Sequence, residues 1–181
     1  GKALLPHFKT GQQNVLNLSS TDGGNGKSYL AQELENYWIT LGLQVRKLTY
    51  DEDFLADDSR YIMSKSIKDL CPDLLPDEIA IIEYPNLNEH SIPSALLNLG
   101  TVNLLVTRAN RTWKDVDQKA LKELQSQLEN KDSLFMYLTE SQRYAVEEFV
   151  GQLPPYTKFN NFVYRLSQMG LTATENSHAK L

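Results

Sequence analysis

The chain has 181 residues, of which 41% are hydrophobic and 23% are charged, as in ordinary globular domains. The formal net charge of −5 gives no electrostatic basis for a nucleic-acid partner or a polybasic membrane contact. A single cysteine, Cys71, cannot form an internal disulfide, has no Cys or His neighbour at metal-ligand spacing, and suits a reducing compartment.

No signal peptide is recognisable, and no apolar run approaches the roughly 20 residues that a membrane-spanning helix needs. The chain opens with Gly1 rather than Met, which leaves open a membrane-spanning portion in a longer parent protein. Because no internal repeat and no linker is visible, we expect residues 1–181 to form one domain, with membrane contact only through the missing part of the parent chain.

Short apolar runs alternate with segments of helical periodicity along the chain. Runs typical of strands occupy residues 14–18, 44–50, 79–82, 102–106 and 134–138. Helices are predicted at 27–41, 59–70, from a Thr112–Asp115 capping box to 128, at 141–149 and at 159–169. Pro154-Pro155 predicts a break, and residues 171–181 are expected to form a disordered tail. The alternation predicts an α/β fold of three layers, with a mainly parallel central sheet flanked by helices.

The segment from Thr21 to Ser28 follows the first strand and precedes the first helix. It matches the phosphate-loop pattern G-x-x-x-x-G-K-[S/T] except at the first position, where Thr21 replaces glycine. Such a loop curls its backbone N–H groups around an anion at a helix N-terminus. The candidate ATP-binding residues are Thr21, Asp22, Gly23, Gly24, Asn25, Gly26, Lys27, Ser28 and Tyr29. The bland alternative is a glycine-rich turn that happens to end in Gly-Lys-Ser, but the flanking elements favour a nucleotide site.

Lys27 would reach the β- and γ-phosphates, and Ser28 would offer its hydroxyl to Mg²⁺. Asp51 and Asp53 follow the second strand, where carboxylates would hold the metal's waters or accept a proton from an attacking hydroxyl. Glu83 follows the third strand, where a Walker-B carboxylate orients Mg²⁺. The alternatives are a solvated acidic loop for the aspartates and, for Glu83, the first solvated residue after a buried strand.

These positions define two predicted groups. Lys27 and Asp51 are the candidate catalytic residues, and Ser28, Asp51, Asp53 and Glu83 are the candidate metal ligands. Arg108 and Arg111 follow the 102–106 strand at the same edge of the sheet, where either would be able to contact phosphate. For both arginines we expect a structural role.

The order of these motifs resembles the cytoplasmic P-loop domain of bacterial tyrosine kinases that govern capsular and exopolysaccharide chain length and export. These kinases are related to partition and septum-site ATPases, and the resemblance extends from about Val15 to Met169. It implies ATP and Mg²⁺ as cofactors, self-association, and the polysaccharide export and polymerisation machinery as partners. It also implies a cytoplasmic location at the inner face of the bacterial plasma membrane, as part of a longer protein.

The resemblance also implies residue roles. Lys27 takes the place of the phosphate-binding lysine, and Ser28 that of the Mg²⁺ ligand. Asp51 and Asp53 match the two aspartates of the second motif, the first of which is implied to act as a base or metal contact. Glu83 takes the position of the third motif's aspartate.

Several positions depart from the family's pattern. Asp22 stands where partition-type ATPases carry a lysine, which disfavours that branch and places a negative charge close to the phosphates. Glu83 is one methylene longer than the family's aspartate, and Leu138-Thr139 replaces an asparagine that helps to read the base. Residues 171–181 contain no tyrosine, whereas the kinases end in a tyrosine-rich tail.

Three interpretations of function therefore stay open. The first is an ATP-dependent tyrosine kinase or ATPase. The second is a degenerate regulatory domain of a polysaccharide co-polymerase, which binds nucleotide weakly or not at all. The third, which Asp22 disfavours, is a partition-like ATPase.

Overall fold

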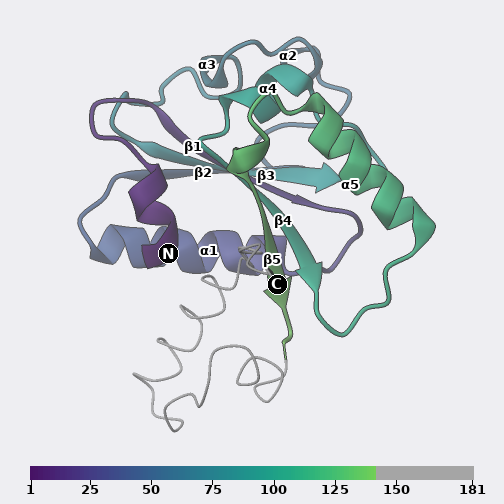
Figure 1. The fold of residues 1–181 in the computed structure, drawn as a ribbon. Coiled ribbons are helices and arrows are strands. Elements are labelled where there is room, and N and C mark those ends of the chain that lie inside the picture. The colour runs from purple at the N-terminus through teal and green to yellow at the C-terminus, as the bar shows by residue number, and fades with distance from the viewer. Residues whose placement is uncertain (142–181) are drawn as a thin grey trace, which may run out of the picture.

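The computed structural model describes residues 1–141, in which five strands form one parallel sheet with helices on both faces (Figure 1). The strands are β1 (Asn14–Ser20), β2 (Val45–Thr49), β3 (Ile79–Asn86), β4 (Val102–Arg108) and β5 (Leu134–Thr139). They lie in the order β2-β3-β1-β4-β5, and every neighbouring pair is parallel. The predicted fold class, α/β with three layers and a central parallel sheet, is confirmed.

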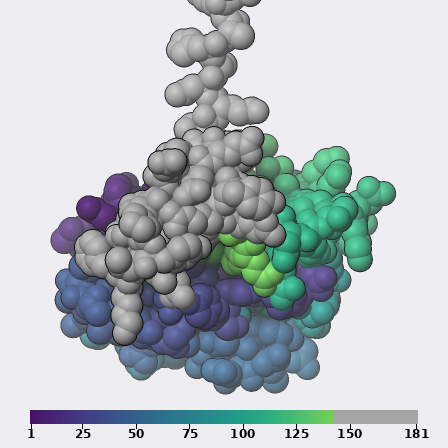
Figure 2. Space-filling model, turned by 90° about the horizontal axis from the view of Figure 1, so that it is seen from below, coloured from purple at the N-terminus to yellow at the C-terminus, as the bar shows by residue number. Residues whose placement is uncertain are grey.

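The helices are α1 (Lys27–Thr40), α2 (Ser59–Ile62), α3 (Ile67–Leu70), α4 (Ser94–Leu99) and α5 (Asp115–Gln127), with two 3₁₀ turns, η1 (Lys2–His7) and η2 (Lys131–Ser133). In Figure 1, α1 lies below the sheet, and α2 to α5 lie above it. Seen from below, the N-terminal part of the chain, coloured purple to blue, forms the left and lower parts of the molecule (Figure 2). One face of the sheet is therefore covered mainly by α1 and the other by four helices.

Each face of the sheet has its own apolar core. Leu16 and Leu18 of β1 belong to the core under α1, together with Leu34 and Trp38 of that helix. Val15, one position before Leu16, belongs to the opposite core, together with side chains of α2 to α5. This division follows from the alternation of side chains along a strand, and it explains why the central strands are apolar on both faces.

The central strand β1 lies between β3 and β4. The chain leaves β1 toward α1 on one face, whereas it leaves β3 and β4 toward α4 and α5 on the other. Neighbouring loops at the carboxyl ends of these strands therefore turn to opposite faces, which is where ligands bind in open α/β sheets. The glycine-rich loop begins at this place.

The predicted helix over 59–70 is wrong, because the segment forms two short helices, α2 and α3. The second helix has its own N-terminal cap, in which the Ser66 side chain accepts a hydrogen bond from the Lys68 N–H. The Asp69 carboxylate accepts a 2.9 Å hydrogen bond from the Ser66 N–H in return. This reciprocal capping box starts a new helix and ends the continuous one that the apolar spacing suggested.

Two other boundaries differ from the prediction. Strand β3 continues through Asn86, so Glu83 lies inside the strand rather than just beyond its end. The proposed capping box of Thr112 and Asp115 is wrong, because α5 begins at Asp115 and the Asp117 carboxylate accepts a 2.9 Å hydrogen bond from the backbone N–H of Lys114. Helix α4 was not predicted, because its six residues are too few to display a helical period.

The predicted helices at 141–149 and 159–169, the break at Pro154-Pro155 and the tail at 171–181 lie outside the described residues. Within residues 1–141, no helix combines the length and the apolar character that crossing a membrane requires.

Candidate functional site

The glycine-rich loop joins the end of β1 to the start of α1. Gly24 and Gly26 adopt left-handed backbone conformations, with φ of 67° and 87°, which glycine accepts without steric cost. Thr21, at the first position of the pattern, is not among the described residues with positive φ, and its side chain is buried. The loop therefore has no need of glycine at position 21, and this departure from the pattern is compatible with its shape.

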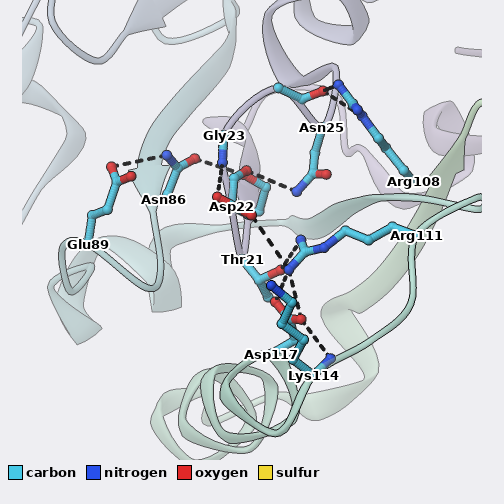
Figure 3. Close-up of polar contacts among 12 residues, drawn as sticks. Thr21, Asp22, Gly23, Asn25, Asn86, Glu89, Arg108, Arg111, Lys114 and Asp117 are labelled. Carbon is cyan, nitrogen blue, oxygen red and sulfur yellow. Dashed lines mark hydrogen bonds and ion pairs between the residues drawn. The ribbon is translucent and has the colours of Figure 1, made fainter.

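Side chains of β4 and β5 hold the loop by its carbonyl groups. The Arg108 guanidinium, from the end of β4, donates a 2.8 Å hydrogen bond through Nε to the carbonyl oxygen of Gly24 (Figure 3). The Thr139 hydroxyl, from the end of β5, donates a 3.0 Å hydrogen bond to the carbonyl oxygen of Asn25. Thr139 therefore anchors the loop from the end of β5.

Unlike the carbonyl groups of Gly24 and Asn25, most backbone amides of the loop have no partner within residues 1–141. The Gly23 N–H donates a 2.8 Å hydrogen bond to the Asp22 carboxylate. Within residues 1–141, the backbone N–H groups of residues 24–28 have no hydrogen-bond acceptor. Unpaired amides in a glycine-rich turn at the head of a helix favour an anion, because the amide dipoles and the helix dipole both present positive charge there.

The Lys27 side chain turns toward the strand ends. Its Nζ donates hydrogen bonds to the Ser20 hydroxyl at 2.6 Å and to Asn86 Oδ1 at 2.9 Å, and the residue is only 9% exposed. Burial lowers the pKa of Lys27, while the negative charges of Glu83 and Glu89 act to raise it. No carboxylate of the described residues forms an ion pair with it. Lys27 thus holds a partly desolvated positive charge at the site.

Asn86 is a site residue that the sequence did not reveal. Its Oδ1 accepts hydrogen bonds from Lys27 and from the Ser20 hydroxyl, while its Nδ2 donates to the Glu89 carboxylate at 3.1 Å (Figure 3). The only signal in the sequence is a polar residue just after Pro85, three positions beyond Glu83. Because the apolar run predicts that the strand ends before this point, the sequence does not place Asn86 at the site.

Ser28 and Glu83 are brought into direct contact. The Ser28 hydroxyl donates a 2.6 Å hydrogen bond to Glu83 Oε1. Glu83 is 7% exposed, and its Oε2 is buried with no hydrogen-bond partner among the described residues. A buried carboxylate oxygen without a partner is unusual and calls for a ligand, water or ion. A serine hydroxyl beside a carboxylate supplies the oxygen ligands that Mg²⁺ prefers, so these residues fit the predicted metal.

Asp51 and Asp53 come just after β2, at the end of the sheet where Glu83 lies on the neighbouring strand β3. Thr49 pairs with Glu83 across β2 and β3, so these aspartates follow that pairing by two and four residues. Asp53 accepts a 2.7 Å hydrogen bond from the Thr49 N–H and thereby stabilises the end of β2. Within residues 1–141, no three His, Cys, Asp or Glu side chains form a group that could hold a metal ion. The proposed roles of Asp51 and Asp53 in metal binding and proton transfer stay predictions.

Arg111 also reaches the loop. Its guanidinium forms an ion pair of 2.7 Å with Asp117 and donates a 3.2 Å hydrogen bond to the Thr21 hydroxyl (Figure 3). Although burial acts to raise the pKa of Asp117, hydrogen bonds from Thr21 and Lys114 and the charge of Arg111 lower it overall. Asp117 was not predicted as a site residue, because in the sequence it is only a second aspartate, two positions after Asp115.

The comparisons with known proteins leave the family unassigned. No protein-family model and no curated protein sequence matches the chain. Among solved structures, the chain is similar to the kinase domain of the Escherichia coli tyrosine kinase ETK, with a TM-score of 0.48 and 11% identity. That match covers 86% of this chain and 76% of the other. Function must therefore be assigned from the contacts of this chain's own residues.

Proposed function

We propose that the domain binds a magnesium nucleoside triphosphate, ATP in the first instance, at the loop of residues 21–29. The observation that carries this proposal is the 2.6 Å hydrogen bond between Ser28 and Glu83. It joins the head of α1 to the neighbouring strand β3 and leaves one buried carboxylate oxygen without a partner among the described residues. The inward-facing Lys27 lies on the same loop as the amides of residues 24–28, which have no acceptor within residues 1–141.

Each residue has a distinct part in this proposal. The amides of residues 24–28 and the Lys27 ammonium bind the phosphate oxygens, and Ser28 and Glu83 hold Mg²⁺. When bound, Mg²⁺ neutralises charge that develops on the phosphates. Asn86 and Ser20 orient the Lys27 ammonium through their hydrogen bonds. Asp51 acts as the base for an attacking hydroxyl or water, and Asp53 supports it.

We further propose that the domain is tyrosine-kinase-like and takes part in the synthesis and export of capsular or exopolysaccharides. The support is the order of motifs, from the loop of residues 21–28 through Asp51 to Glu83. ETK is described as a tyrosine kinase, and this activity is a property of ETK. On this proposal the domain self-associates, contacts the export and polymerisation machinery, and lies in the cytoplasm at the inner face of the bacterial plasma membrane.

A second candidate is a degenerate regulatory domain without catalysis, and Asp22 is the observation that favours it. Its carboxylate already accepts the Gly23 N–H and lies 3.6 Å from Arg111, so the loop holds an anion of its own. A ligand with several phosphates would meet this negative charge.

Calorimetric titration of Mg-ATP into the wild type and Lys27→Ala tests the proposal. We expect the wild type to bind and Lys27→Ala to lose at least about tenfold in affinity, or about 1.4 kcal/mol. Lys47→Ala is the matched control, because Lys47 lies on the edge strand β2 and its ammonium contacts only Glu35 and Gln32 among the described residues. No heat with the wild type would remove the nucleotide-binding proposal and leave the regulatory candidate. If ATP binds, transfer of radiolabelled phosphate to protein rather than to water would identify a kinase.

A further inference from the structure

Arg111 is fixed in place by a buried partner. Its side chain is 18% exposed, and Asp117 is 1% exposed. Nη2 donates to both Asp117 oxygens, at 2.7 and 2.8 Å. Because Asp117 lies in the first turn of α5, this helix positions the guanidinium over the first residues of the glycine-rich loop.

Not every N–H donor of the Arg111 guanidinium has an acceptor among the described residues. An arginine carries five N–H donors, of which Arg111 directs two to Asp117 and one to Thr21. No hydrogen bond of its Nε is made to any residue in the part of the chain that the structure describes. Arginine binds phosphate oxygens especially well, because its donors are arranged in a planar fork.

Asp22 lies against both groups that such a phosphate would contact. Its Oδ1 accepts the Gly23 N–H at 2.8 Å, and its Oδ2 lies 3.6 Å from Arg111 Nη2 (Figure 3). The Asp22 side chain is 57% exposed, so it is able to leave without breaking any buried contact. The Asp22 carboxylate lies between a loop amide and a guanidinium, so it carries negative charge and accepts where a phosphate group would accept.

We propose that Asp22 is an internal competitor for the phosphate chain and that Arg111 is a second phosphate-binding cation beside Lys27. In the free domain, Asp22 accepts the Gly23 N–H and places a second carboxylate beside Arg111. A nucleoside triphosphate displaces the Asp22 carboxylate, takes over the Gly23 N–H and contacts Arg111, which stays paired with Asp117. The inference rests on the proposed function, and it adds that the affinity for the ligand is limited by Asp22.

The test compares Mg-ATP affinities of the wild type, Asp22→Asn, Asp22→Ser and the double variant D22N/R111K by calorimetry. Both replacements of Asp22 keep a side-chain oxygen for the Gly23 N–H and remove the charge. We expect each to bind about fivefold more tightly than the wild type, the effect of one unit charge at about 4 Å in water-like surroundings. The double variant should lose this gain, because lysine cannot reproduce the guanidinium fork.

Asp132→Asn is the control for net charge. It removes the same single charge from an exposed residue of η2, which precedes β5 and so lies at the opposite end of the strands. Its affinity should equal that of the wild type. Circular dichroism of each variant checks that the fold is kept.

The outcomes separate the two proposals. Tighter binding by both Asp22 variants supports the inference. Binding by these variants alone would overturn nucleotide binding by the wild type, while it supports Asp22 as the group that competes for the phosphate site. If the wild type binds and the Asp22 variants bind no better, the inference is overturned and the nucleotide site stands. If neither the wild type nor any Asp22 variant binds, both proposals fail.

Discussion

The Ser28 hydroxyl lies 2.6 Å from Glu83 Oε1, and this contact joins the first turn of α1 to the middle of β3. The other oxygen of Glu83, Oε2, is buried with no hydrogen-bond partner among residues 1–141. Because an unpaired buried carboxylate oxygen is costly, binding of a cation there would relieve the cost. The pair is thus suited to hold a metal that arrives with an anionic ligand.

Glu83→Gln tests this role. Glutamine keeps an oxygen that accepts from Ser28 and loses the negative charge, so we expect Mg-ATP to bind at least about tenfold more weakly. Binding of ATP without Mg²⁺ should be unchanged or slightly stronger. Calorimetric titrations with Mg²⁺ and with EDTA measure both.

A matched control for this variant is Glu78→Gln. Glu78 is also buried, at 8% exposure, but it precedes β3 at the opposite end of the strand and accepts from the Leu75 N–H. Its replacement should leave the Mg²⁺ dependence of ATP binding as in the wild type. Equal Mg²⁺ dependence in Glu83→Gln and the wild type would argue against Glu83 as a metal ligand.

Two glycines of the loop should differ in their tolerance of alanine. Gly26 has φ of 87°, and a Cβ there would lie 3.3 Å from Thr139 Cγ2, so we expect Gly26→Ala to cost about 1–2 kcal/mol in the free energy of unfolding. Gly23 lacks a positive φ, and its Cβ would make an ordinary 3.6 Å contact with Asn86. Gly23→Ala should stay within about 0.5 kcal/mol of the wild type. Urea unfolding of both variants checks this, and equal costs would show that the loop has another shape.

Lys27 should lower the stability of the free domain. Burial lowers its pKa in the folded state, so between this value and the ordinary 10.5 the unfolded chain binds more protons. The charged Lys27 therefore lowers the free energy of unfolding at neutral pH. This loss becomes smaller as pH rises from the folded-state pKa of Lys27 toward 10.5. We expect Lys27→Met to be as stable as the wild type or more stable, by up to about 1 kcal/mol at pH 7.

Urea unfolding of Lys27→Met and the wild type, measured between neutral and alkaline pH, checks the expectation. The stability difference should narrow as pH approaches 10.5. A variant that is clearly less stable at pH 7, with a difference independent of pH, would show that the charged lysine stabilises the fold.

Cys71 should be chemically inert in the folded protein. Burial, together with the Asp73 carboxylate that accepts from its thiol at 3.2 Å, raises the pKa of Cys71 to about 11. At pH 8 only about one molecule in a thousand then carries the reactive thiolate. We expect slow labelling by iodoacetamide in buffer and rapid labelling in urea, measured by mass spectrometry. Comparable labelling rates in both conditions would mean that the thiol is accessible.

The sequence predicts those elements in which the apolar pattern is long enough to show the period of a strand or a helix. The apolar runs of the five strands and the long helices α1 and α5 were expected close to their observed positions. The loop between β1 and α1 was recognisable because the strand, the glycines and the Gly26-Lys27-Ser28 end follow one another in the chain. The contact of Ser28 with Glu83 was implied only by the order of the motifs.

The sequence does not predict contacts that depend on the pairing of distant strands. Strand β3 extends through Pro85 to Asn86, which pairs with Ser20 after a register shift between β1 and β3. No local sequence pattern predicts such a register shift, so Asn86 was not predicted to accept a hydrogen bond from Lys27. Similarly, the hydrogen bond from Arg111 to Thr21 joins residues 90 positions apart in the sequence, and it depends on where α5 begins. Local capping likewise divided the expected helix at 59–70, because Ser66 and Asp69 start a new one.

The central claim is that the amides of residues 24–28 bind the phosphates of a nucleotide. Titration of ¹⁵N-labelled protein with Mg-ATP, followed by the backbone amide resonances, measures this directly. We predict saturable shifts of the Gly24, Asn25, Gly26, Lys27 and Ser28 amides, and in Lys27→Ala the shifts should need at least about tenfold more Mg-ATP. Amide resonances of these five residues that stay unchanged while Mg-ATP is raised to millimolar concentration would contradict the claim.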